Sequence, residues 1–330
     1  MFRKDAGISL FLALALVGVT LGFHPTHVAA QQAPAKTPLL YFIPHSGAGD
    51  PFWATQKAGW ETASGLLPMR GVFAGPPKFD PKEQAEMVGA AVAAAADGIA
   101  VTMAAPQMVK GSLSLARSRG IPVLIINSRQ YGARPEELIP SIGFIGQDED
   151  LTGKALAERV LKEFKPKRAV FGIHHAGHIV HELRARGIMG VLSAHNIPIE
   201  KLDITQEPSR GVGILDSYLK RYPDTDMIFT SGPLGTAASV RLVREKNLQG
   251  KVRLATMDVD KLTLEAIEKG EMIATIAQQP FMQGYLGAVA LYLHVQYGFM
   301  LPPQINTGPT VIDKSNMSLV DKQVKTTGGS

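Results

Sequence analysis

From residue 38 onward, short apolar runs alternate with longer segments that have helical spacing. Since consecutive parallel strands need a crossover that is usually a helix, this alternation predicts parallel sheets with helices on both faces. Strands buried on both faces are continuous apolar runs, as these are. The predicted strands cover residues 39–43, 71–74, 98–103, 122–127, 141–146, 168–173, 202–205, 226–231, 252–258 and 272–277.

Ten strands are more than one sheet usually holds. The pattern also pauses near IGQDED, at residues 145–150, where a new helix is expected to begin. We therefore predict an α/β fold made of two doubly wound, Rossmann-like lobes of similar size.

The composition excludes several classes of protein. Hydrophobic residues make up 45% of the 330 residues and charged residues 19%, which fits a folded chain rather than a disordered one. The net charge of +5 is not gathered into a basic block with interleaved aromatics, so no nucleic-acid partner is expected. The absence of cysteine excludes disulfides and thiolate metal sites.

The first thirty residues have the pattern of a secretory signal peptide. Arg3 and Lys4 precede an apolar stretch at residues 8–22, and the small residues Val28 and Ala30 stand just before Gln31. The stretch is short for a membrane span, which needs about 20 apolar residues. We expect residues 1–30 to be removed by cleavage near Ala30, and the mature protein to be periplasmic.

Polar and aromatic side chains follow the carboxyl ends of the predicted strands, where ligands bind in such folds. They comprise residues 46–53, 127–129 and 174–184, together with Gln206, Glu207, Gly232, Asp258 and Gln278. The set has no general base paired with a nucleophile in a recognisable elbow such as G-x-S-x-G. We therefore expect a binding protein that needs no cofactor, and not an enzyme.

Four segments resemble the periplasmic substrate-binding proteins of sugar ABC transporters, of the ribose- and galactose-binding type (type I periplasmic binding proteins). The segments are GDPFWATQKAGWETA (49–63), residues 97–128 around the GIPV strand, IGQDEDLTGKALAERVL (145–161), and residues 250–291. The order and spacing of these segments match the family, and the resemblance spans roughly residues 37–315.

The resemblance implies two lobes joined by a three-segment hinge that closes on a sugar. We expect an N-terminal lobe of residues 31–147 plus 279–308, and a C-terminal lobe of residues 148–278 plus 309–330. It also implies delivery of the ligand to a membrane permease partnered by an ATPase. We expect the protein to be a monomer.

Transferred to this sequence, the family's pocket predicts ligand contacts. The expected residues are Ser46, Asp50, Phe52, Trp53, Asn127, Arg129, Arg184, Gln206, Gly232, Asp258 and Gln278, to which we add His175 from the strand-end segment. Arg129 stands one position later than the family's arginine. Gln206 stands where ribose binders have an aromatic, and Gly232 where they have an asparagine. The expected ligand is thus a monosaccharide or similar polyol other than ribose, with a nucleoside or a signalling furanone as alternatives.

The residue types suit a neutral polyol. Phe52 and Trp53 can cover the C–H faces of a sugar ring, while carboxylates and arginine form charge-assisted hydrogen bonds to its hydroxyls. Asp50 has a structural alternative, because it precedes Pro51 and can cap the following helix.

A metal-binding module is the alternative carried by HHAGHIVH, which places His174, His175, His178 and His181 within eight residues. His174 and His175 end a predicted strand, so helical spacing does not bring them onto one face with the others. The predicted site therefore includes no metal. A ligand-binding sensor for a chemoreceptor or a histidine kinase is a further alternative.

Overall fold

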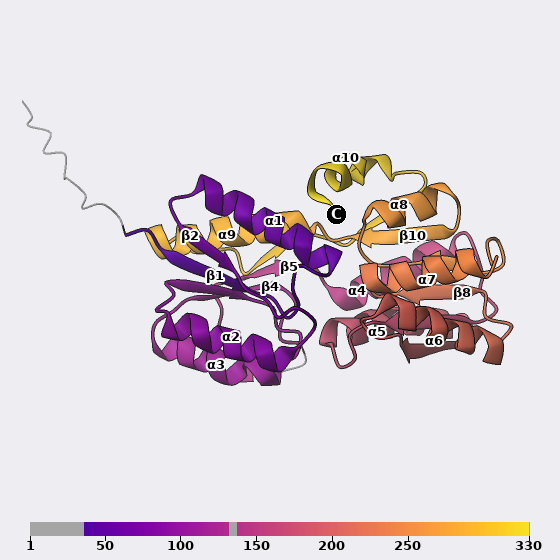
Figure 1. Ribbon diagram of the computed structural model, residues 1–330, viewed down its shortest axis with the longest axis horizontal. Helices are drawn as coiled ribbons and strands as arrows, with labels where there is room; N and C mark the ends of the chain where they lie inside the picture. Colours follow the sequence, from indigo (N-terminus) through magenta and orange to yellow (C-terminus); the bar gives the residue numbers. More distant parts are fainter. Residues whose placement is uncertain (1–35, 132–136, 330) are drawn as a thin grey trace, which may run out of the picture. The chain divides into compact units, whose positions relative to one another are not determined.

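A computed structural model describes residues 36–131 and 137–329. The predicted signal peptide lies outside the described residues. The described chain contains two six-stranded sheets, drawn with their covering helices in Figure 1. The first sheet holds β1 (Leu39–Ile43), β2 (Arg70–Phe73), β3 (Gly98–Val101), β4 (Val123–Asn127), β5 (Phe144–Gly146) and β11 (Gln304–Asn306). The second holds β6 (Ala169–Ile173), β7 (Ile199–Asp203), β8 (Met227–Thr230), β9 (Arg253–Ala255), β10 (Met272–Ala277) and β12 (Thr310–Asp313).

The two sheets have the same strand order. It is β11-β5-β4-β3-β1-β2 in the first sheet and β12-β10-β9-β8-β6-β7 in the second. Every pair is parallel except β10 with β12, which is antiparallel. The chain passes between the sheets after β5, after β10 and again after β11. This confirms the predicted α/β class with two doubly wound sheets. The exact lobe boundaries stay a prediction.

Helices cover both faces of each sheet and bury the apolar strands. On the first sheet, α1 (Pro51–Leu66) and α9 (Pro280–Tyr297) cover one face, and α2 (Pro81–Ala93) and α3 (Pro106–Ser118) cover the other. On the second, α4 (Glu149–Leu161) and α5 (Ile179–Ala194) lie opposite α6 (Pro208–Arg221), α7 (Pro233–Glu245) and α8 (Lys261–Glu268). The last helix, α10 (Ser318–Thr327), packs by Val320 and Val324 against α8 and β12.

The strand predictions differ from the structure mainly at sheet edges. The strand predicted at 202–205 is β7 at 199–203, an edge strand whose residues are all at least partly exposed. The short strands β11 and β12 were not predicted, because QIN and TVID are short and partly polar. Among the described helices, none is both long enough and apolar enough to cross a membrane.

Helices α1 and α9 approach closely at two glycines. A Cβ atom added at Gly59 would lie 2.1 Å from the carbonyl oxygen of Phe281, and one added at Gly284 would lie 2.1 Å from that of Gln56. Since real Cβ atoms do not come so near to backbone oxygens, only glycine allows this spacing of the two helices.

We predict that Gly59→Ala lowers the free energy of unfolding by about 1–3 kcal/mol, because the added methyl group forces α1 and α9 apart. Gly65→Ala is the matched control in the same helix, where the added Cβ meets no atom within 4 Å. It should leave stability unchanged or raise it by up to about 1 kcal/mol. Urea unfolding of both variants provides the measurement, and equal effects would contradict the packing argument.

Candidate binding site

A small pocket lies where the carboxyl ends of strands from both sheets come together. Its volume is about 30 Å³. Side chains from both sheets line it. From the first sheet and its loops come His45, Asp50, Phe52, Trp53 and Asn127. From the second come His174, His175, His178, Val180, His181, Arg184, Ser231, Pro233, Asp258 and, after β10, Gln278. This is the position that doubly wound folds use for ligands.

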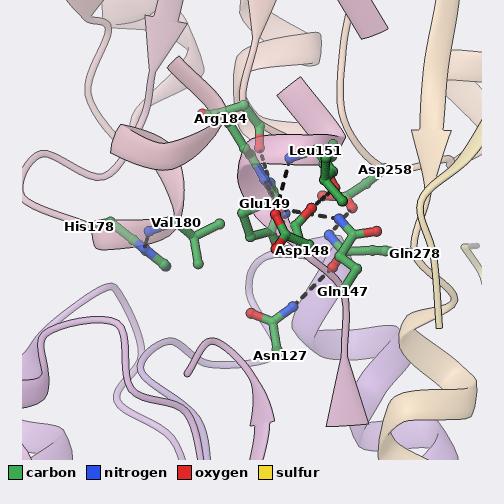
Figure 2. Close-up of polar contacts among 12 residues, drawn as sticks. Asn127, Gln147, Asp148, Glu149, Leu151, His178, Val180, Arg184, Asp258 and Gln278 are labelled. Carbon is green, nitrogen blue, oxygen red and sulfur yellow. Dashed lines mark hydrogen bonds and ion pairs between the residues drawn. The ribbon is translucent and has the colours of Figure 1, made fainter. Parts of the chain in front are cut away.

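Asn127 is the last residue of β4, and Asp258 follows β9, the strand that holds the equivalent place in the second sheet. Both have positive φ, 63° and 69°, in the left-handed region that Asn and Asp tolerate better than most residues. Gln278 connects them: its Oε1 accepts from the Asn127 amide at 3.0 Å, and its Nε2 donates to the Asp258 carboxylate. Figure 2 shows this chain of contacts, which runs from one sheet to the other.

Arg184 and Glu149 form a buried ion pair beside this chain. The guanidinium Nε lies 2.7 Å from Oε2 of Glu149 and Nη2 lies 3.1 Å from Oε1, while Nη1 donates to the carbonyl of Ser231 at 2.9 Å. Arg184 is 3% exposed and Glu149 is fully buried. The two-pronged geometry orients Arg184 and leaves one N–H on each Nη for a ligand.

The two pocket carboxyls have raised pKa values. Burial raises the pKa of Asp258 to about 7, although Arg184 and the Gln278 amide favour its charged form. Burial also raises the pKa of Asp50 to about 6, against the N–H of Phe52 that its carboxylate accepts at 2.9 Å. Asp50 thus caps α1 and also lines the pocket. Near neutral pH, the Asp258 carboxyl can either donate or accept a hydrogen bond.

Five buried histidines fill the pocket from both sides. His174 and His175 follow β6, His178 caps α5, His181 lies in its first turn, and His45 follows β1 of the other sheet. Each is at most 4% exposed. Burial lowers the pKa of His175 to about 3 and those of the other four well below the ordinary value, so all five imidazoles are neutral.

The hydrogen bonds of His45 and His178 determine their tautomers. His178 Nδ1 accepts from the N–H of Val180 at 3.1 Å, so its proton is on Nε2. That proton points at His45 Nε2, 2.8 Å away, and His45 Nδ1 then donates to the hydroxyl of Thr102 at 2.8 Å. The two sheets are therefore joined in the pocket by one imidazole–imidazole hydrogen bond.

Aromatic rings enclose the histidines. Phe79 stacks on His175, with ring centroids 4.7 Å apart, and on His178 at 5.3 Å. Trp53 meets the His45 ring edge-to-face at 4.6 Å, and Phe52 lies against Trp53. The predicted aromatic platform is thus at the pocket, but here it packs on imidazoles.

The structure brings eight of the twelve sequence-predicted residues into the pocket lining: Asp50, Phe52, Trp53, Asn127, His175, Arg184, Asp258 and Gln278. Their contacts with a ligand remain predictions. The other four, Ser46, Arg129, Gln206 and Gly232, lie outside the lining.

Each of those four has another structural setting. Arg129 pairs with Asp148 at 3.5 Å and donates to Gln304, while Gln206 accepts from the N–H of Phe79 at 2.9 Å. Ser46 is buried. At Gly232, an added Cβ would lie 3.0 Å from Cε1 of His174 and 3.1 Å from Oδ2 of Asp258, so the glycine leaves room for both side chains.

Sequence reasoning missed His45 in the pocket. The expected contacts begin at Ser46, one residue after His45, whose ring meets His178 from the other side of the pocket. Counting from the last residue of β1 would have included it, since His45 follows Ile43 by two residues.

The comparisons with known proteins agree with this geometry. The model of a family described as "Periplasmic binding protein domain" matches residues 40–298. The xylose/arabinose-binding protein XylF of Sulfolobus acidocaldarius is 26% identical over 289 residues, which cover 84% of this chain and 71% of that protein.

Solved structures are also similar. A periplasmic sugar-binding protein of an ABC sugar transporter from Legionella pneumophila is 28% identical, with a TM-score of 0.77, covering 82% of this chain and 99% of that one. A carbohydrate transporter from Acidothermus cellulolyticus, in complex with myo-inositol, is 24% identical with a TM-score of 0.80, covering 88% and 99%. At that identity, the second likeness concerns the fold alone.

Proposed function

Because the chain belongs to the periplasmic binding protein family, we propose that it captures a monosaccharide or similar polyol in the pocket between its sheets. It delivers this ligand, in the periplasm, to the permease of an ABC importer that is powered by an ATPase. The sugar-binding relatives at 26% and 28% identity support this class of ligand. The protein acts as a monomeric binding component and catalyses no reaction.

One observation carries the proposal: Asn127 of one sheet and Asp258 of the other meet through Gln278 inside the pocket. These groups, with Arg184, offer donors and acceptors that match sugar hydroxyls from two sides. A ligand held by both sheets favours the closed arrangement, because only such contacts differ between the open and closed forms.

The pocket is narrow in this structure. A volume of about 30 Å³ has room for a few water molecules but not for a sugar ring. Entry of a ligand therefore requires the two halves of the pocket to separate. The three segments in which the chain crosses between the sheets, after β5, β10 and β11, would act as the hinge.

In this proposal, Asp50, Asn127, Arg184, Asp258 and Gln278 bind hydroxyls, and Phe52 and Trp53 cover the apolar face of the ring. His175 adds a neutral donor or acceptor. The four predicted residues outside the lining would reach a ligand only if the pocket rearranges.

The test is a thermal-shift screen with pentoses, hexoses, deoxysugars, inositols and nucleosides, followed by calorimetry of each hit. A ligand that binds the folded state raises the Tm with its concentration. We predict that Asp258→Ala lowers the affinity for the best ligand about 10- to 150-fold, since a hydrogen bond to a charged group contributes roughly 1.5–3 kcal/mol.

Asp321→Ala is the control, because Asp321 forms an exposed pair with Lys325 on α10. Its affinity for the ligand should equal that of the unmodified protein. If no sugar or polyol shifts the Tm, the proposed ligand class is wrong. If Asp258→Ala binds as tightly as the control, the site assignment is wrong.

A further inference from the structure

The pocket contains a set of three histidines, of which the proposed sugar site uses only His175. One candidate nitrogen from each of His174, His175 and His181 lies within 4.8 Å of the other two. The three side chains are 3–4% exposed, so water does not reach them freely.

Two of these imidazoles lack a hydrogen-bond partner for one ring nitrogen. Among the described residues, no group bonds to Nε2 of His175 or to Nδ1 of His181. Buried polar atoms are normally paired, and leaving one unpaired costs free energy. His174 differs, since its Nδ1 lies 2.9 Å from the Ser231 hydroxyl, which leaves Nε2 for another partner.

We propose that His174, His175 and His181 together bind a divalent transition-metal ion of the zinc class. Neutral imidazole nitrogens are common ligands of zinc, nickel and copper, and three imidazoles leave an open position for water or a substrate oxygen. This inference does not rest on the proposed function, and it concerns a different kind of ligand.

Formation of such a site requires rotation of the rings. Tetrahedral zinc with Zn–N bonds of about 2.0–2.1 Å places its nitrogens about 3.3 Å apart. The rings of His175 and His181 are 5.3 Å apart and nearly parallel, at 6°. Rotation about χ2, a broad torsion in histidine, can direct both lone pairs at one point.

The surrounding charges also permit a cation. Arg184 lies close enough to affect the imidazoles, but its charge is balanced by Glu149 at 2.7 Å. The carboxyl of Asp258 is near His174, since both would touch a Cβ at Gly232. Ser231 can hold His174 in the tautomer that exposes Nε2, as partners of metal-binding histidines do.

A second set, His45, His175 and His178, fits a metal less well. His178 accepts the N–H of Val180 on Nδ1, so its Nε2 carries the proton and has no lone pair for an ion. A metal at this set would have to break both that bond and the bond to His45.

The experiment is calorimetric titration of the chelator-treated, sugar-free protein with Zn²⁺, and separately with Ni²⁺ and Co²⁺. We expect one ion per chain and a Tm that rises with ion concentration. His174→Ala and His181→Ala should each weaken binding at least 100-fold, and Ser231→Ala about 10-fold. Absorption of bound Co²⁺ in the visible range should disappear in the same histidine variants.

The controls separate the competing outcomes. His294→Ala, a histidine outside the pocket, should bind the ion with unchanged affinity. His45→Ala tests the second set, and it should weaken binding far less than His174→Ala. Loss of binding in His45→Ala but not in His174→Ala would overturn the assigned ligands in favour of the second set. No binding, or binding that all variants retain, would overturn the metal site. The unfolding midpoint of each ion-free variant shows whether it is folded. Because this assay contains no sugar, its outcome is independent of the sugar screen.

Discussion

Glu149→Ala should lower the free energy of unfolding by about 3–5 kcal/mol. The substitution leaves the guanidinium of Arg184, only 3% exposed, without the carboxylate that holds it at 2.7 Å. An uncompensated buried charge is far more costly than the net contribution of the pair itself. Urea unfolding followed by circular dichroism measures the loss.

The control is Glu61→Ala, which removes the exposed ion pair with Lys57 on α1. Exposed pairs contribute about 0–1 kcal/mol, so this variant should be nearly as stable as the unmodified protein. The double variant Glu149→Leu with Arg184→Met should recover most of the stability, because it removes both charges. A loss below 1 kcal/mol in Glu149→Ala would mean that Arg184 finds water or another partner.

Acidification should destabilise the ligand-free protein steeply below pH 6.5. Burial lowers the pKa of His45, His174, His175, His178 and His181, so the unfolded chain binds more protons than the folded one in this range. Stability from a lowered histidine pKa is complete above the unfolded value, about 6.5, and is lost as the pH falls.

The pocket carboxyls act in the opposite direction. The pKa values of Asp258 and Asp50, raised to about 7 and about 6, make the folded state bind extra protons between about pH 4 and those values. Five imidazoles outnumber two carboxyls, so the net effect of acid is a loss of stability. Each proton of difference contributes about 1.4 kcal/mol per pH unit, so the total is several kcal/mol between pH 6.5 and 5.

The measurement is the Tm of the chelator-treated protein from pH 7.5 to 5. His178→Gln and His45→Gln should reduce the slope, since each removes one buried imidazole. The exposed His195 is the control, and His195→Gln should not alter the slope. A Tm that stays level or rises on acidification would contradict the assignment of neutral, buried imidazoles.

Most of the pocket follows from a rule that needs only strand ends. Asn127, Asp258 and Gln278 each come directly after an apolar run, and parallel strands bring their carboxyl ends to one edge. The same rule does not distinguish a residue that faces the pocket from its neighbour. Ser46 and Arg129 are therefore among the predicted ligand contacts, although it is His45 and Asn127 that line the pocket.

The amino-acid sequence by itself determined the α/β class and the two-sheet organisation, because strand and helix periodicities depend on backbone geometry over a few neighbouring residues. Only the tertiary structure decided that Arg184 pairs with Glu149 and that His45 meets His178 at 2.8 Å, although 133 residues separate these two histidines in the chain. Such contacts depend on how the chain passages place one sheet against the other. No local pattern in the sequence encodes that placement, which is why the contact of His45 with the four histidines of HHAGHIVH appeared only in three dimensions.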